Sequence, residues 1–332
     1  MGNFLQVLKK AIKNKKGRIA FPESIDSRIL QAINELLADQ TVFEIYLFAR
    51  REEILNQAKK ENCLALLKYE KQLLCVGEDF KISKKALKLF LKENMKHKPL
   101  SDEALDELCL SPLYMAGYLL AQGKVDCVLA GVLTETSHVI RAALRTVGKA
   151  EGVQTVSGSF IMQRDEEIYL YADCGVNIEP SLDELVDIAM ESQKTWKALP
   201  MLNQRQAHMA FLSFSTKGSA KHKLCLKMEK AASLVKERDP NVIVDGELQF
   251  DAAIDLEIGK RKAPGSPVAG KANIFIFPDL NAGNIAYKIT QRLGGFSAYG
   301  PILQGLKKPY CDLSRGATVH DIVVCAYINL LR

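Results

Sequence analysis

Short, fully apolar segments alternate with amphipathic segments along most of this chain of 332 residues. A strand that is apolar on both faces has to be covered on both faces, and parallel neighbours need a crossover connection. The alternation therefore predicts an α/β fold with mainly parallel sheets between layers of helices. The predicted strands include residues 18–22, 42–48, 126–131 and 210–214, and the predicted helices include residues 4–12, 137–147 and 219–236.

The length of the chain allows one large α/β domain or two domains of ordinary size. A turn bounded by Gly148 and Gly152 separates two series of predicted strands and helices, so it is the expected hinge between two domains. No low-complexity linker and no internal repeat interrupts either series.

The composition is that of an ordinary soluble protein. Hydrophobic residues make up 48% and charged residues 25% of the chain, which argues against disordered, collagen-like and coiled-coil classes. No apolar run approaches the roughly 18 residues that a membrane span requires, and the amino-terminal residues lack the pattern of a secretion signal. We therefore expect a cytoplasmic protein with no membrane partner.

The formal net charge of +6 comes from 45 basic and 39 acidic residues, and its surplus falls near the amino terminus. This distribution is weak evidence for a nucleic-acid surface, so no nucleic acid is expected as a partner. A solvated face of helix 4–12, ending at the Lys15-Lys16-Gly17 turn, explains the surplus better. A positive field that attracts an anionic substrate is the alternative. The basic residues concerned are Lys9, Lys10, Lys13, Lys15, Lys16 and Arg18.

The sequence gives little support for a metal site or a nucleotide-binding motif. The 8 cysteines form no C-x-x-C pair and the 5 histidines form no H-x-x-x-H set, which indicates buried reduced thiols and no metal site. Residues Gly265 to Lys271 have the spacing of a phosphate loop, but Ala272 stands where that motif needs Ser or Thr. No predicted strand precedes the segment, and a dinucleotide G-x-G-x-x-G motif is absent.

A serine, an arginine and a glycine lie just before the last predicted helix. Thr318 and Asp321 have the spacing of a capping box, so Asp321 is expected to close the amino end of that helix. Ser314 and Arg315, in the preceding turn, are suited to hold an anion and to orient a reacting carbonyl. The structural and functional interpretations are compatible.

A second polar turn follows the predicted strand 126–131. Thr136 lies in a threonine-rich stretch there, and Arg141 follows in the next predicted helix. Hydroxyl and guanidinium groups at the carboxyl end of a strand are well placed to bind a phosphate. The alternative is a helix N-cap with a solvent-facing arginine.

Seven segments stand out in order along nearly the whole chain: FPESIDSRIL (21–30), VIRAALRTVG (139–148), YADCGVNIEP (171–180), LSFSTKGSA (212–220), VDGELQFDAA (244–253), KAPGSPVAGKANIFIFPDLNAGNIAYKITQRLGG (262–295) and GPILQGLKKPYCDLSRGATVHDIV (300–323). Together they resemble the phosphate acetyltransferase (phosphotransacetylase) family, whose members interconvert acetyl-CoA plus phosphate with acetyl phosphate plus CoA. Because the segments occur in order, the resemblance is specific, whereas any one of them alone would establish little.

The resemblance implies two three-layer α/β/α domains of the isocitrate/isopropylmalate dehydrogenase-like class, with a cleft between them, in a homodimer. In this family the carboxyl-terminal segment completes the first domain. The implied boundaries are residues 1–148 plus 302–332 for domain I and residues 149–301 for domain II.

The same resemblance implies an acyltransferase of acetate metabolism that acts on coenzyme A, acetyl phosphate and inorganic phosphate and requires neither a cofactor nor a metal. Carried over by position, Ser314, Arg315 and Asp321 match the catalytic serine, arginine and aspartate of the family. Arg141 matches its anion-binding arginine, and Thr136 lies in the matching threonine-rich loop.

The implied mechanism is direct attack in a ternary complex. Asp321 would deprotonate the CoA thiol, and the thiolate would attack the acetyl carbonyl of acetyl phosphate. Since an ordinary Asp has a pKa of about 3.9, desolvation on CoA binding is expected to raise the pKa of Asp321. Ser314 would donate a hydrogen bond to the developing oxyanion, while Arg315 and Arg141 would stabilise the leaving phosphate. A covalent acetyl-cysteine route is the alternative, for which only Cys311 lies near the turn.

The chain departs from the family at three positions. Met95 stands where an arginine is usual, Pro99 where a glycine is usual, and Ala130 where a serine is usual. Near Met95, Lys96 or Lys98 can supply a positive charge in place of the missing arginine, but neither reproduces a bidentate guanidinium. We expect activity to survive with altered phosphate affinity or acyl preference, since the matched serine, arginines and aspartate are present.

Three alternatives remain open. Phosphate butyryltransferase shares the fold and the chemistry of the family. A decarboxylating dehydrogenase of the same fold would need a nicotinamide site and clustered metal-binding aspartates, neither of which the sequence shows. A CoA-binding homologue with reduced activity is suggested by Met95.

Overall fold

The computed structural model describes residues 2–13 and 17–332. By its internal contacts the chain divides into two compact units, which we describe separately. The amino-terminal unit comprises Gly2–Glu151 and Leu306–Arg332, and the central unit comprises Gly152–Gly305. The boundaries predicted from sequence lie after residues 148 and 301. Lys15 and Lys16, which belong to the predicted helix end and basic cluster, lie outside the described residues.

A parallel sheet with the strand order β3-β2-β1-β4-β11 forms the centre of the amino-terminal unit. Strand β11 comes from the carboxyl-terminal segment, and its last residue, Asp312, pairs with Ala130 at the end of β4. The strands are β1 (Gly17–Phe21), β2 (Val42–Leu47), β3 (Leu73–Cys75), β4 (Cys127–Ala130) and β11 (Tyr310–Asp312).

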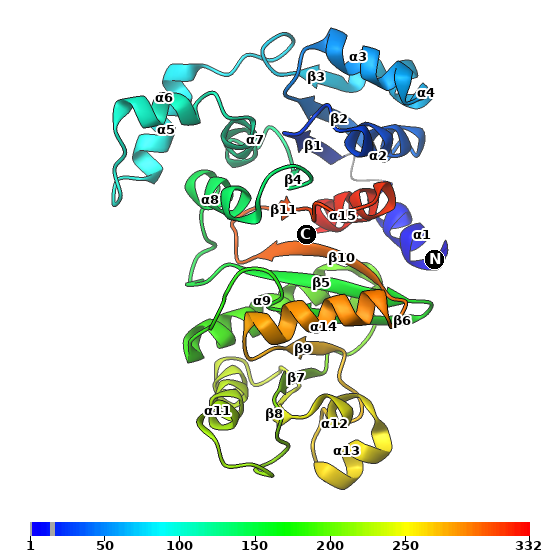
Figure 1. Ribbon diagram of the computed structural model, residues 1–332, viewed down its shortest axis with the longest axis vertical. Coiled ribbons are helices and arrows are strands. Elements are labelled where there is room, and N and C mark those ends of the chain that lie inside the picture. The colour runs from blue at the N-terminus through cyan, green and yellow to red at the C-terminus, as the bar shows by residue number, and fades with distance from the viewer. Residues whose placement is uncertain (1, 14–16) are drawn as a thin grey trace. The chain divides into compact units, whose positions relative to one another are not determined.

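Two groups of helices cover this sheet, one on each side of β1, β4 and β11 (Figure 1). In one group α1 (Gly2–Ile12), α2 (Ser27–Ala38) and α15 (Val319–Leu331) pack together. In the other, α7 (Pro112–Ala121) packs on α8 (Thr136–Thr146), and α8 also packs on β11. The remaining helices of this unit are α3 (Arg51–Lys60), α4 (Leu64–Lys68), the 3-10 helix η1 (Glu70–Gln72), α5 (Lys84–Asn94) and α6 (Asp102–Leu108).

The central unit has the strand order β10-β5-β6-β9-β7-β8, with α9 and α14 both packed on β6 and β10 (Figure 1). Strand β5 pairs antiparallel with β6 and β10, while β6, β9, β7 and β8 are parallel. The elements are β5 (Ser157–Arg164), β6 (Glu167–Ala172), α9 (Leu182–Ala198), α10 (Pro200–Asn203), β7 (Met209–Leu212), α11 (Lys223–Arg238), β8 (Val244–Leu248), α12 (Phe250–Ile254), α13 (Leu256–Lys262), β9 (Ile274–Ile276), α14 (Leu280–Arg292) and β10 (Ser297–Gln304).

The α/β prediction is confirmed, because each strand and helix predicted by position overlaps an observed one of the same type. The antiparallel strands were not predicted. Strands β5 and β6 are joined by a tight turn in which Asp165 has a φ of 50°, so no helix separates them and the alternation breaks there.

The carboxyl ends of β1, β4 and β11 meet at one edge of the amino-terminal sheet, because these neighbouring strands are parallel. Glu23 follows β1, and its carboxylate holds the segment that follows β4. Oε2 accepts from the backbone N–H groups of Gly131 and Val132, both at 2.9 Å. Oε1 accepts from Leu133 at 2.9 Å and from Thr134 at 2.7 Å. One side chain therefore fixes the backbone that leads into α8.

We expect Glu23→Gln to lower the free energy of unfolding by at least about 2 kcal/mol. The amide would place its NH₂ group against backbone donors, so two of the four hydrogen bonds would be lost and the charge assistance of the others removed. Urea denaturation followed by circular dichroism measures the change.

Glu52→Gln is the matched control, because Glu52 is exposed on α3. This substitution is expected to change stability by less than about 0.5 kcal/mol. Equal stability of the two variants would show that the Glu23 carboxylate does not hold the segment 131–134.

Candidate functional site

The segment after β11 contains the predicted Ser314 and Arg315 and is fixed by its backbone. The N–H group of Leu313 donates to the carbonyl of Ala130 at 2.5 Å, which ties the segment to the end of β4. Ser314 then begins a turn, in which its carbonyl accepts from Ala317 at 2.9 Å and its Oγ accepts from the Gly316 N–H at 3.2 Å. The side chains of Ser314 and Arg315 are exposed. The turn thus has a defined backbone and presents its functional groups outward.

Arg28 joins this turn to the segment after β4. Its Nη1 donates to the carbonyls of Arg315 and Ala317 at 2.7 and 3.3 Å, and its Nη2 donates to the carbonyl of Val132 at 3.1 Å. Asp26 fixes the guanidinium through an ion pair of 2.9 Å. Arg28 therefore positions the two segments relative to each other.

Sequence reasoning assigned no role to Glu23 or Arg28, although both belong to the segment FPESIDSRIL. The available signal was a pair of opposite charges directly after a predicted parallel strand. Polar residues at the carboxyl end of such a strand commonly contribute to a site.

Thr136 and Arg141 both lie on α8. Thr136 is the first residue of the helix, and the N-cap residue Glu135 makes no side-chain capping hydrogen bond, so no side chain at the N-cap position occupies the donors there. The Arg141 guanidinium is exposed. In the part of the chain that the structure describes, neither Arg141 nor Arg315 forms an ion pair. A guanidinium without a carboxylate partner is available to bind an anion in a bidentate fashion.

Asp321 has the capping role that its spacing predicts. Its Oδ2 accepts from the Thr318 N–H at 2.9 Å, and the Thr318 hydroxyl accepts from the Asp321 N–H at 3.2 Å. Within the described residues its other oxygen, Oδ1, accepts no hydrogen bond. The carboxylate therefore closes α15 with one oxygen and keeps the other for a ligand or a proton.

Asp312 is a further charged residue at this edge, and sequence reasoning gave it no role. Its side chain is 1% exposed, and neither of its oxygens reaches a hydrogen-bond partner in the described chain. Burial raises the pKa of Asp312 to about 7, the Thr136 hydroxyl opposes this increase, and the negative charge of Glu23 adds to it. The pairing of β11 with β4 creates this environment, so no local sequence pattern predicts that Asp312 is buried.

Met95, which stands where the family usually has an arginine, is a core residue. Met95 follows α5, is 7% exposed, and packs in an apolar cluster with Leu91, Tyr114 and Ala142. Lys96 and Lys98 are exposed beside it. The side chain of Met95 therefore contributes packing beneath α8 and no surface charge.

The other motifs give the following outcomes. All 8 cysteines are free and buried, as predicted. The Gly265–Lys271 segment follows the helix α13, so it lacks the preceding strand of a phosphate loop, as expected from the sequence. Among the described residues, no three or more His, Cys, Asp or Glu side chains are placed to hold a metal ion, and no helix is long and apolar enough to span a membrane.

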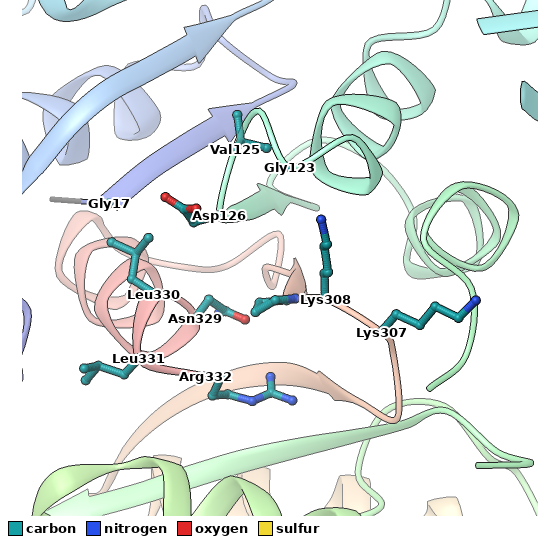
Figure 2. Close-up of a pocket in the computed structure, with 11 residues that line it drawn as sticks. Gly17, Gly123, Val125, Asp126, Lys307, Lys308, Asn329, Leu330, Leu331 and Arg332 are labelled. Atoms are coloured by element: carbon teal, nitrogen blue, oxygen red, sulfur yellow. The ribbon is translucent and has the colours of Figure 1, made fainter. Parts of the chain in front are cut away.

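A cavity of about 510 Å³ lies at the opposite edge of the amino-terminal sheet (Figure 2). It is lined by Gly17, Asp126 and Pro309, which begin or precede β1, β4 and β11, and by Asn329 and Arg332 at the end of α15. None of the predicted site residues lines it. The strands run between this cavity and the predicted site, so the two are separate places.

All the predicted site residues lie in the amino-terminal unit, on α8, on the turn after β11 and on α15. The packing of α8 on β11 and the bonds from Arg28 bring the two polar segments together. These elements carry two guanidiniums that form no ion pair among the described residues, a hydroxyl and a carboxylate. These groups suit the binding of an anion beside a proton acceptor.

Comparison with known proteins identifies the family. The chain matches the family described as phosphate acetyl/butaryl transferase over residues 3–330. The phosphate acetyltransferase of Bacillus subtilis (strain 168) is 39% identical over 331 residues, covering 99% of this chain and 98% of that protein. The crystal structure of a phosphotransacetylase from Streptococcus pyogenes has a TM-score of 0.89 at 37% identity, covering 99% of this chain and 97% of that chain.

The dehydrogenase-like fold class is confirmed by a more distant structure. The 4-hydroxythreonine-4-phosphate dehydrogenase of Klebsiella pneumoniae has a TM-score of 0.51 at 9% identity, covering 95% of this chain and 98% of that chain. At this identity the likeness shows the fold alone. The family match, in contrast, extends over nearly the whole chain and is accompanied by relatives of the same length. The chain therefore belongs to the phosphate acetyl/butaryl transferase family.

Proposed function

We propose that this protein is a phosphate acetyltransferase, which transfers an acetyl group reversibly between coenzyme A and phosphate. Relatives with that name are 38% to 39% identical over 99% of the chain. The structural observation that carries the proposal is a pair of exposed guanidiniums, Arg141 on α8 and Arg315 in the turn after β11, that form no ion pair among the described residues. Ser314 lies in the same turn as Arg315, and Asp321 lies on α15.

The free oxygen of Asp321 accepts the proton of the CoA thiol in this proposal. The thiolate sulfur forms a bond to the acetyl carbon of acetyl phosphate, and the bond from that carbon to the phosphate oxygen breaks. The electron pair leaves with the phosphate, which takes up the proton from Asp321. Ser314 donates a hydrogen bond to the carbonyl oxygen as its negative charge develops. Arg141 and Arg315 bind the phosphoryl oxygens throughout.

Coenzyme A, acetyl phosphate and inorganic phosphate are the proposed substrates, and the chain's own side chains perform each step without a cofactor or a metal. We further propose that the protein acts as a homodimer in the cytoplasm, in acetate metabolism. The family resemblance supports both proposals.

The purified protein is expected to form acetyl-CoA from acetyl phosphate and CoA, followed by the absorbance of the thioester. Butyryl phosphate, assayed side by side, tests the second candidate, since the family description names both acyl groups. We expect the higher rate with acetyl phosphate. A higher rate with butyryl phosphate would make the protein a phosphate butyryltransferase, and no turnover with either substrate would refute the proposal.

Asp321→Asn is expected to reduce kcat at least about 100-fold, because a general base contributes that much or more to a rate. The asparagine carbonyl oxygen still accepts from the Thr318 N–H, so the cap of α15 is retained and the loss reports the missing proton acceptor.

Glu184→Gln provides the matched control for this substitution. Glu184 closes the capping box of α9 with Ser181 in the same geometry, in the central unit. The control is expected to keep the wild-type kcat. An Asp321→Asn variant as active as this control would remove Asp321 from the mechanism.

Met95→Arg is expected to lower the free energy of unfolding by about 2 to 3 kcal/mol without improving phosphate binding, because the guanidinium would enter an apolar cluster. Lys96→Arg adds the same group at the exposed neighbouring position and is expected to leave stability unchanged. Urea denaturation and the phosphate KM measure both effects. A stable Met95→Arg variant with a lower phosphate KM would show that position 95 reaches the substrate.

A further inference from the structure

Two acidic residues lie at the site edge, and their surroundings differ. Glu23 accepts four backbone hydrogen bonds. Asp312 is 1% exposed, and in the described chain neither of its oxygens has a hydrogen-bond partner. A buried carboxyl group without a hydrogen-bond partner is unusual, because burying an unpaired carboxylate raises the free energy of the folded state.

The neighbours of Asp312 come from each element that surrounds it. Gly131, after β4, has a φ of 111°, and a Cβ at that position would lie 2.5 Å from Asp312 Oδ1, so the carboxyl packs directly against the glycine. Thr136, the first residue of α8, faces the carboxyl closely enough to lower its pKa without reaching full hydrogen-bond geometry. The charged group that acts on Asp312 is Glu23. Tyr310, on the same strand, is itself affected by the charge of Asp312.

Among the described residues the charged group that acts on this carboxyl is the acidic Glu23, and no cation is among the groups that act on it. Burial and the Glu23 charge together raise the pKa of Asp312 to about 7. Near neutral pH a large share of the molecules therefore carries a proton on Asp312. A protonated carboxyl has one O–H donor, and the facing Thr136 hydroxyl is an acceptor.

The protonation state of Asp312 decides what the Thr136 hydroxyl offers to a ligand. When the carboxyl is protonated, it donates to Thr136 Oγ1, and the hydroxyl proton of Thr136 points away toward the start of α8. When the carboxyl is ionised, that hydroxyl turns inward to donate to it.

We propose that Asp312 is a positioning residue that must hold a proton for Thr136 to donate a hydrogen bond to the phosphoryl group of the substrate. Phosphate binding is then coupled to proton uptake by a side chain that does not touch the phosphate. This inference rests on the proposed function, since it takes the phosphoryl group to bind at the start of α8 beside Arg141.

Isothermal titration of inorganic phosphate into the full-length protein tests the coupling, in buffers of different ionisation enthalpy between pH 6 and pH 9. The wild type is expected to take up more protons on binding than Asp312→Asn does. Its affinity relative to that variant is expected to fall above pH 7, by at most tenfold per pH unit, because one proton is involved. The protonation of phosphate itself changes with pH in the same way in both experiments, so it does not contribute to the difference between the wild type and Asp312→Asn.

Asp312→Asn keeps the shape of the side chain and is uncharged at every pH, and its amide can donate to Thr136. A purely structural role for Asp312 would alter thermal stability and leave the proton uptake on phosphate binding unchanged. Equal proton uptake and parallel affinity profiles in the two proteins would therefore overturn the inference.

Thr136→Val and Thr136→Ser test the same coupling with Asp312 in place, which covers the case in which Asp312→Asn does not fold. The valine variant is expected to bind phosphate more weakly and to lose the extra proton uptake, while the serine variant retains both properties. Uptake that persists in Thr136→Val would overturn the inference.

The phosphate KM in the acetyl-transfer assay separates this inference from the proposed function. If the enzyme turns over, and its phosphate KM rises above pH 7 relative to that of Asp312→Asn, the result supports both the inference and the proposed function. Turnover with parallel profiles overturns the inference alone, and proton-linked phosphate binding without turnover overturns the proposed function alone. If phosphate does not bind to the wild type at any pH, the inference fails.

Discussion

The carboxylate of Glu23 is the interaction on which the predicted site depends. Four consecutive backbone N–H groups after β4 donate to it, and in an irregular segment they would otherwise need water. Arg28, five residues further along the chain, does the complementary work by donating to carbonyls of both polar segments. The carboxylate of Glu23 binds N–H donors and the guanidinium of Arg28 binds carbonyl acceptors. The single stretch after β1 that contains both residues therefore holds two segments that are distant in sequence.

The charges at this edge fall into two groups. Arg28 pairs with Asp26, so its charge is balanced within the protein and its role is structural. Arg141 and Arg315 have no such partner among the described residues. A paired guanidinium would have to give up its carboxylate before binding a phosphate, whereas an unpaired one loses only water. The pattern of pairing therefore separates the arginines that hold the backbone from those available to a ligand.

Three carboxyl groups of the amino-terminal unit have three environments and three uses. Glu23 is saturated by backbone donors, Asp321 has one oxygen in a helix cap and one free, and Asp312 is buried with neither oxygen bonded. The same functional group thus serves as a fixed anion, a candidate proton acceptor and a candidate proton store. Hydrogen-bond donors and burial decide among these uses, since they stabilise opposite protonation states.

The sequence by itself determined the elements whose signals are local. The alternation of apolar and amphipathic segments follows from the periods of strands and helices, and the capping box of Thr318 and Asp321 is set by a spacing of three residues. Turn and strand-end patterns pointed to Ser314, Arg315, Thr136 and Arg141 as candidate anion-binding residues, and the family resemblance supplied their expected roles. Only the tertiary structure decided that Met95 is buried beneath α8, that Glu23 binds the segment after β4, and that Asp312 lies unpaired under Gly131 and Thr136. The contacts of Glu23 and Asp312 arise because β4 lies between β1 and β11, and strand order joins residues that no local pattern relates.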